Sequence, residues 1–172
     1  MKKENYFIIL LLILTSFSSC KKDDLAYGND FEKSYSAWTD FKKTSNNSYR
    51  YTVESSSWTG FSTTTVLTIN EGKVVKRSYV AKSIDRSSNQ IIIREQWEEE
   101  GVTLNTHPNG SVLTTLDEVY QKAKAEWLPQ RANAKHYFEA KNGGIISSCG
   151  YVEDNCADDC FVGVTITSVE KI

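Results

Sequence analysis

The chain has 172 residues, of which 40% are hydrophobic and 24% are charged, and its formal net charge is −2. This length supports one domain with a buried core. A weakly acidic chain has no electrostatic basis for binding nucleic acid, so no nucleic-acid partner is predicted. Beyond the N-terminus, no hydrophobic stretch reaches the roughly 20 residues that a membrane-spanning helix needs.

The first 20 residues have the layout of a bacterial lipoprotein signal peptide. Lys2 and Lys3 precede an apolar stretch from Tyr6 to Leu14, and small residues lead from it to Cys20. The apolar stretch is too short to cross a membrane but suits the hydrophobic region of a signal peptide. The segment resembles a lipobox, which implies cleavage before Cys20, a thioether-linked diacylglycerol on its sulfur, and an acylated N-terminus carrying a chain such as palmitate.

Residues 1–19 are therefore predicted to be a signal peptide, residues 20–30 a lipidated tether, and residues 31–172 a single domain. The predicted partner of Cys20 is the membrane, since each buried acyl CH₂ contributes about 0.8 kcal/mol. Lys22-Asp23-Asp24 follows at once and resembles the surface-export signal of Bacteroidetes lipoproteins. That resemblance implies an outer-membrane protein that faces outward. The alternatives are a periplasm-facing lipoprotein with a charged tether, or ordinary secretion with Cys20 as a structural thiol.

The first half of the domain is predicted to be one helix followed by four strands. The helix runs to about Lys43, with Asn29 or Asp30 as its cap and apolar side chains that recur near the helical period. Alternation and β-branched residues predict strands over residues 49–54, 64–69, 73–83 and 90–98. Asn70-Glu71-Gly72 supplies the turn of the central hairpin. Glu98-Glu99-Glu100 is expected to be a strand end in water.

The second half begins with a helix and ends with a hairpin. Residues 115–118 read Thr-Leu-Asp-Glu, a capping box in which Thr115 and Glu118 satisfy each other's backbone donors. An apolar stripe continues to Trp127, and Pro129 ends the helix. A strand is expected near residues 135–141, and a closing hairpin pairs residues 145–149 with 161–169. The predicted fold class is α+β: a single domain with an antiparallel β-sheet, one face of which is covered by helices.

The order of several short motifs adds a family resemblance. These motifs are Trp38, residues 48–53, residues 70–74, residues 115–120, and Ala157-Asp158-Asp159 before the final strand. Together they resemble a family of small secreted bacterial domains of unknown function, catalogued under number 6174. Members of that family carry a Gly-aromatic-Pro motif before the last hairpin, where this chain has residues 142–145, Asn-Gly-Gly-Ile. The resemblance implies no activity and no catalytic residues.

Three further cysteines lie in the last hairpin, and export to an oxidising compartment predicts a disulfide among them. If Ile145 pairs with Val164, antiparallel pairing places Cys149 opposite Cys160 and leaves Cys156 free. The alternatives are Cys149–Cys156 and Cys156–Cys160, between which sequence alone does not choose.

The turn between these strands is acidic, and its carboxylates are the candidates for metal binding. Calcium would suit Asp154, Asp158 and Asp159, but their spacing is not that of an EF-hand. A zinc site would need a fourth ligand beside the cysteines, either His136 or Asp154. The favoured interpretation is a solvated turn with local backbone hydrogen bonds, so no metal and no cofactor are predicted.

The sequence contains no catalytic motif. His107 and His136 are the only histidines, and neither adjoins a nucleophile motif such as Gly-x-Ser-x-Gly. We therefore expect a non-catalytic outer-membrane lipoprotein that binds a protein or an envelope component. The uncovered sheet face, with Trp58 and Phe61 near it, is the candidate surface. The alternative is a structural accessory subunit of an outer-membrane complex, and a hydrolase or a redox protein using Cys156 or the acidic turn is less favoured.

Overall fold

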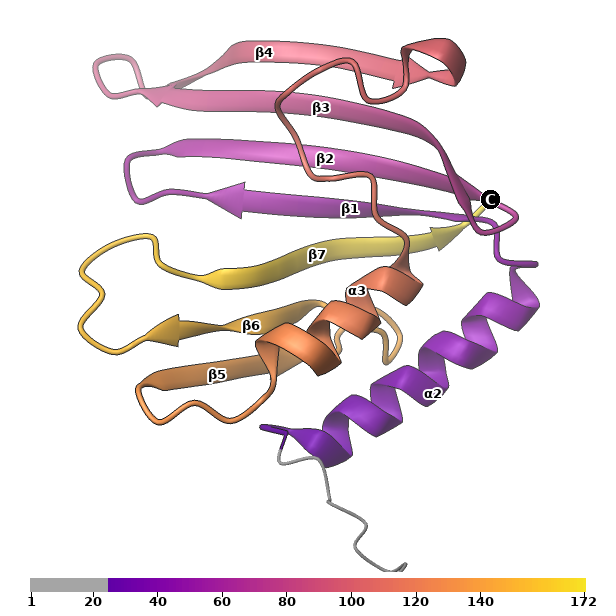
Figure 1. The fold of residues 1–172 in the computed structure, drawn as a ribbon. Helices are drawn as coiled ribbons and strands as arrows, with labels where there is room; N and C mark the ends of the chain where they lie inside the picture. The colour runs from indigo at the N-terminus through magenta and orange to yellow at the C-terminus, as the bar shows by residue number, and fades with distance from the viewer. Residues whose placement is uncertain (1–24) are drawn as a thin grey trace, which may run out of the picture.

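A computed structural model shows the fold and describes residues 25–172 (Figure 1). The predicted signal peptide, Cys20 and Lys22-Asp23-Asp24 lie outside the described residues. The elements in chain order are α2 (Gly28–Thr44), β1 (Tyr49–Ser56), β2 (Phe61–Asn70), β3 (Lys73–Asp85), β4 (Gln90–Glu100), a 3₁₀ turn (Gly101–Thr103), α3 (Leu116–Lys122), a π-helical turn (Ala123–Trp127), β5 (Ala134–Glu139), β6 (Ser148–Glu153) and β7 (Val162–Lys171).

The strands form one seven-stranded sheet in the order β4-β3-β2-β1-β7-β6-β5, and every pair is antiparallel. Both helices lie against the same face of this sheet (Figure 1). The predicted α+β fold, with helices on one sheet face, is confirmed. The β1-to-β4 meander follows the expected order because its hairpin turns are short, and short turns join antiparallel neighbours.

The start of α2 differs from the prediction. Tyr27 is the N-terminal cap residue, in a left-handed conformation with φ 59°, and it makes no side-chain cap hydrogen bond. Asn29 and Asp30 lie inside the first turn, so the prediction that one of them caps the helix is wrong. Tertiary contacts fix the start instead, because the Ala26 N–H donates to the Leu128 carbonyl over 2.8 Å.

Aromatic side chains join the two helices to the sheet. Trp38 of α2 packs edge-on against Tyr49 of β1, with ring centroids 5.1 Å apart, and its indole N–H donates to Asp117 over 2.9 Å. The Tyr49 hydroxyl in turn accepts from the Leu116 N–H at the start of α3 over 2.9 Å. The predicted capping box of Thr115 with Glu118 is present. These contacts place both helices over the centre of the sheet.

The β2–β4 side of the same face is crossed by the loop that follows β4 rather than by a helix (Figure 1). Glu99 holds this loop, since its carboxylate accepts from the backbone N–H groups of Asn105, Thr106 and His107 over 2.8–3.2 Å. Arg77 pairs with Glu99, its Nε donating to Oε1 over 2.7 Å, and it also donates to the carbonyls of His107 and Ser111. One buried ion pair therefore attaches the loop to the sheet.

The expectation that residues 98–100 all end in water is wrong for Glu99. This residue is 1% exposed and Arg77 is 3% exposed, because strand alternation directs both side chains to the helix-bearing face. Burial raises the pKa of Glu99, but hydrogen bonds from the Asn105 and His107 backbone, the His107 ring and Arg77 outweigh it and lower that pKa to about 2. The carboxylate therefore stays ionised at neutral pH.

We predict that Glu99→Gln lowers the free energy of unfolding by about 3 kcal/mol near neutral pH, because it leaves the Arg77 charge buried without its partner. The folded pKa of Glu99 lies below its ordinary value of 4.5. The stabilisation is therefore present above about pH 4.5 and is lost as the pH falls toward about 2. Urea unfolding at several pH values measures both effects.

The matched control is Glu98→Gln, because Glu98 pairs with Lys76 on the exposed face and should change stability by less than about 1 kcal/mol. Asp85 also has a pKa lowered to about 2, by hydrogen bonds from Ser87 and Ser88. Both carboxyls therefore contribute to the pH dependence of the unfolding free energy. Subtracting the unfolding free energy of Glu99→Gln from that of wild type at each pH isolates the contribution of Glu99. An unchanged unfolding free energy in Glu99→Gln would show that the ion pair does not hold the loop.

Candidate functional site

The sheet is forked between β1 and β7. These strands pair only from Tyr49↔Lys171 to Val53↔Ile166, with a register shift between Thr52 and Val53. Beyond that point β1 continues beside β2 as far as Ser56, while the first half of β7 pairs with β6 instead. Figure 1 shows the two strands separating toward the end of the sheet where the β1–β2 turn lies.

Two glycines explain why β7 follows β6 here. Gly150 of β6 and Gly163 of β7 face each other in the ladder, and the Phe161 ring lies against both of them. A Cβ on Gly163 would collide with the Cys149 carbonyl oxygen, and a Cβ on Gly150 would collide with that of Val162. The two backbones thus approach more closely than side chains would allow, and the first half of β7 stays paired with β6.

The fork leaves backbone groups of both strands without a neighbouring strand. The Ser57 N–H donates to the Phe61 carbonyl, so the backbone groups of Ser57 point toward β2. Successive residues of a strand direct their N–H and C=O groups to alternate sides, so those of Glu54 and Ser56 point toward β7. On the other side, the Ile166 N–H donates to Ser147 next to β6, so the same period directs those of Gly163 and Thr165 toward β1. The pairing of Val53 with Ile166 joins the Glu54 N–H to the Thr165 carbonyl, so the strands open beyond this contact, at Ser56 and Gly163. All four residues are exposed.

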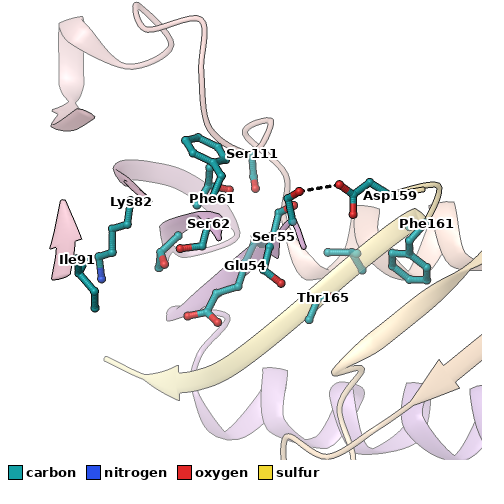
Figure 2. Close-up of a pocket in the computed structure, with 17 residues that line it drawn as sticks. Glu54, Ser55, Phe61, Ser62, Lys82, Ile91, Ser111, Asp159, Phe161 and Thr165 are labelled. Carbon is teal, nitrogen blue, oxygen red and sulfur yellow. Dashed lines mark hydrogen bonds between the residues drawn. The ribbon is translucent and has the colours of Figure 1, made fainter. Parts of the chain in front are cut away.

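A groove of about 880 Å³ occupies the fork, a size within the range of ligand sites. Residues of β1, β2 and β7 supply most of its lining, and Ser111 of the loop after β4 adds to it (Figure 2). Strand alternation places Val53, Phe61 and Val164 on the helix-facing side. Glu54 and Thr165 belong to the opposite side of the sheet. The groove therefore combines apolar and polar walls with open strand edges.

One hydrogen bond crosses the outer end of the groove. The Ser57 hydroxyl donates to the Asp159 carboxylate over 2.7 Å, and it links the β1–β2 turn to the acidic turn before β7 (Figure 2). Both groups are exposed, so this bond contributes little to stability. It marks the length of the fork, from the last β1–β7 pair at Val53 to Ser57.

The rim of the groove carries exposed apolar side chains. Phe61, one of the two predicted binding residues, lines the groove and is 42% exposed. Trp58, the other, is 70% exposed in the adjacent turn but does not line the groove. Ile91 of β4 belongs to the lining and is 69% exposed. The ladder places Phe61 on the helix-facing side and Ile91 on the opposite side of the sheet, so the groove has an exposed apolar side chain beside it on each face. Exposed apolar side chains beside a groove are typical of binding surfaces.

The cysteines form a disulfide, but not between the preferred partners. Cys156 and Cys160 are bonded, with their Cα atoms 6.2 Å apart, and Cys149 is a buried free thiol. The preferred Cys149–Cys160 pairing is wrong because the ladder sets Cys149 opposite Val164. Cys160 therefore lies in the turn beyond the last ladder pair. The open alternative Cys156–Cys160 is the one observed, and burial raises the pKa of Cys149 to about 12.

Asp158 and Asp159 lie in the turn that the disulfide closes, and Asp154 lies two residues before it. Asp154 donates its backbone N–H to Asn133, Asp159 binds Ser57, and Asp158 is exposed. Within residues 25–172, no group of three or more His, Cys, Asp or Glu side chains lies close enough together to hold a metal ion. The turn thus contributes one side chain, that of Asp159, to the groove.

The two histidines lie apart from the groove and from each other. His107 stacks on Trp97 at 4.3 Å between ring centroids, and its Nδ1 lies 3.1 Å from Glu99. Among the residues that the structure describes, its ring makes no hydrogen bond to a Ser, Thr or Cys side chain. His136 is buried and its Nε2 lies 3.0 Å from the Pro129 carbonyl. Both histidines attach loops to strands.

The sequence analysis named Phe61 as a binding candidate and Asp159 as a metal candidate, but it did not place the two at one site and it missed the β7 wall. The signals that were available are Gly150 and Gly163, whose lack of side chains permits the close β6–β7 approach. Glu54 and Thr165 carry no sequence signal of their own, because a polar residue on an exposed strand face is ordinary.

A scan against protein-family models found no match to this chain, and searches of curated proteins and of solved structures found no similar protein. No helix within residues 25–172 is long and apolar enough to cross a membrane.

We predict that thiol labelling of a soluble Cys20→Ser protein separates the three remaining cysteines. No thiol reacts in the oxidised native state, two react after mild reduction, and Cys149 reacts only on unfolding, because its buried thiol is not ionised. Mass spectrometry of the labelled peptides measures this. Native labelling of Cys149 after reduction would contradict the observed pairing and burial.

Proposed function

We propose that this chain is a non-catalytic lipoprotein of the outer membrane that binds a protein or another envelope component in the groove between β1 and β7. The observation that carries this proposal is the groove itself, with strand edges that open beyond the Glu54–Thr165 contact and with exposed Phe61 and Ile91 side chains on opposite faces of the sheet. Strand edges and exposed apolar side chains are features through which proteins bind partners.

Anchoring through Cys20 and surface exposure are parts of the same proposal. Cys20 precedes the first described residue, Leu25, by five positions, so the tether spans at most about 18 Å. Leu25 bridges to Pro129, just before the edge strand β5. The opposite edge strand, β4, lies six strand spacings away, or about 29 Å. An anchor at Cys20 would therefore attach on the β5 side of the sheet, opposite the β4 edge.

A structural accessory subunit is the second candidate, and the edge strand β4 favours it. Ile91 and Ile93 project from this strand with exposures of 69% and 57%, and Ile84 of β3 lies opposite Ile91 in the ladder. A long edge strand with exposed apolar side chains is prone to pairing with another protein. A stable complex through this edge would bring a stoichiometric partner through purification in mild detergent.

Protease treatment of intact cells tests the location. We expect the wild-type protein to fractionate with membranes and to be removed from whole cells, and Cys20→Ser to be released into the soluble fraction. Protection in whole cells, with cleavage only after lysis, would place the protein on the periplasmic side. Membrane association of Cys20→Ser as strong as that of wild type would contradict lipid anchoring.

Site-specific photocrosslinking tests the groove as the binding site. A photoreactive amino acid replaces Phe61 in one variant and Lys33, an exposed residue of α2, in a matched control. We expect a discrete adduct in living cells from position 61 and none from position 33, because only the former lies at the groove. Adducts from both positions or from neither would contradict the assignment.

A further inference from the structure

We propose that two copies of this chain associate through the outer edge of β4, in an antiparallel pairing centred on Ile92 that joins their sheets into one. The inference goes beyond the proposed function and depends on neither the groove nor the lipid anchor. It is carried by the open backbone groups of this edge, by the isoleucines beside them and by the distribution of charge along the strand.

The backbone groups of Ile91 and Ile93 face outward from β4. The Ile84 N–H of β3 donates to the Gly60 carbonyl beside β2 over 3.2 Å, so the groups of Ile84 point away from β4. Ile84 and Ile91 are ladder partners, and an antiparallel pair exchanges both of its hydrogen bonds or neither. The groups of Ile91 therefore point away from β3, and strand alternation gives Ile93 the same direction. β4 is the outermost strand at its end of the sheet (Figure 1).

The open part of this edge has defined ends. Arg94 has no ladder partner and forms a bulge, and its Nε donates to the Ser83 hydroxyl over 2.6 Å. A bulge interrupts regular pairing, so the regular open segment before it is residues 90–93. At the far end of β4, the Glu100 N–H already donates to the Thr103 hydroxyl over 3.1 Å.

The opposite edge of the sheet carries features that prevent such pairing. β5 has only six residues, and its exposed side chains include those of Lys135 and Glu139. Short edge strands and charged side chains, Lys above all, discourage edge-to-edge association. β4 has 11 residues, and its open segment reads Gln-Ile-Ile-Ile. One edge is therefore protected against association and the other is not.

Pairing about Ile92 matches the side chains of the two copies. It sets Ile91 of one copy opposite Ile93 of the other, and each such pair exchanges two backbone hydrogen bonds because both residues face outward. The ladder places Ile84, Ile91 and Ile93 on the uncovered sheet face, where they are 46%, 69% and 57% exposed. These isoleucines of both copies would form one apolar cluster, and the two Ile92 side chains would meet on the helix-facing side.

The charges favour the antiparallel direction. The half of β4 after the bulge is acidic, with Glu95, Glu98 and Glu100. Arg86 lies in the turn before β4, where the Asp85 carboxylate is bonded to Ser87 and Ser88. Antiparallel pairing sets the turn of one copy beside the glutamates of the other, whereas a parallel copy would set glutamates beside glutamates.

Lys82 is the charged neighbour of the isoleucine cluster, and it does not oppose the pairing. It lies on β3 directly opposite Ile93, so its methylene stem can pack on that side chain while the ammonium group stays in water. The Lys82 residues of the two copies would be three strand spacings apart, about 14 Å. That distance exceeds the Debye length at physiological salt, so their repulsion is screened.

Sedimentation velocity of the soluble Cys20→Ser protein measures the association, at concentrations from about 1 to 500 µM. The paired segment is short, so the dimer should bury less than the roughly 800 Å² per partner of a standard interface. We therefore expect a dissociation constant in the micromolar range.

Two lysine variants test whether β4 is the interface. Ile93→Lys should weaken the dimer at least tenfold, because a two-fold dimer contains the change twice. Ile93 is chosen because Ile91 also lines the groove. The matched control is Val102→Lys, which places the same charge on a fully exposed apolar residue beyond β4 and should leave the dissociation constant unchanged.

Cysteine crosslinking tests the register. The two copies of Ile92 would face each other as a non-hydrogen-bonded pair with Cα atoms about 4.5 Å apart, a separation that a disulfide spans. Ile92→Cys should therefore give a covalent dimer on mild oxidation. In the matched variant Ile93→Cys, the two new thiols lie on diagonal positions about 7–8 Å apart, so little covalent dimer is expected. Non-reducing gel electrophoresis measures both.

A protein that stays monomeric throughout this concentration range overturns the inference, as does a dimer that Ile93→Lys leaves unchanged. Crosslinking of Ile93→Cys as strong as that of Ile92→Cys overturns the pairing centred on Ile92. A monomer that instead purifies with a different protein bound at β4 assigns this edge to the accessory role and also overturns self-association. A monomer that still gives an adduct from position 61 in cells removes this inference alone, whereas a dimer without that adduct removes the proposed groove function alone.

Discussion

The short pairing between β1 and β7 is the constraint on which the rest of the site depends. A register shift at Thr52 and Val53 ends that pairing, and the Gly150–Gly163 contact commits the first half of β7 to β6. The sheet therefore consists of two halves, β1–β4 and β5–β7, which pair with each other only along the last residues of β7. The groove, its open strand edges and its mixture of apolar and polar walls all follow from this division.

A second constraint keeps the β2–β4 half of the sheet in shape. The helices cover the centre of the sheet, and the loop after β4 covers part of the remainder through the Arg77–Glu99 ion pair. Because this loop also carries Ser111 into the groove lining, the ion pair supports one wall of the site from a distance. A buried ion pair of this kind stabilises only while both partners and their hydrogen bonds are present.

The sequence predicted the fold class, the strand order of the first hairpins and the capping box at Thr115, because these depend on local patterns. It failed where long-range register decides. The Cys149–Cys160 pairing assumed a register that the β6–β7 ladder shifts, so that Val164 lies opposite Cys149. Glu99 was expected in water because three consecutive glutamates do not indicate which one strand alternation directs into the core. The lipobox at Cys20 and the family resemblance stay predictions.

Amide hydrogen exchange of the free protein, followed residue by residue by NMR, tests the forked sheet most directly. The forked sheet predicts an alternating pattern beyond the last β1–β7 contact, with fast exchange at Ser56, Gly163 and Thr165. Slow exchange is predicted at Ser55 and Val164, which face β2 and β6. Uniform slow exchange along both strands would show that β1 and β7 pair throughout, and would contradict the groove and the binding function proposed for it.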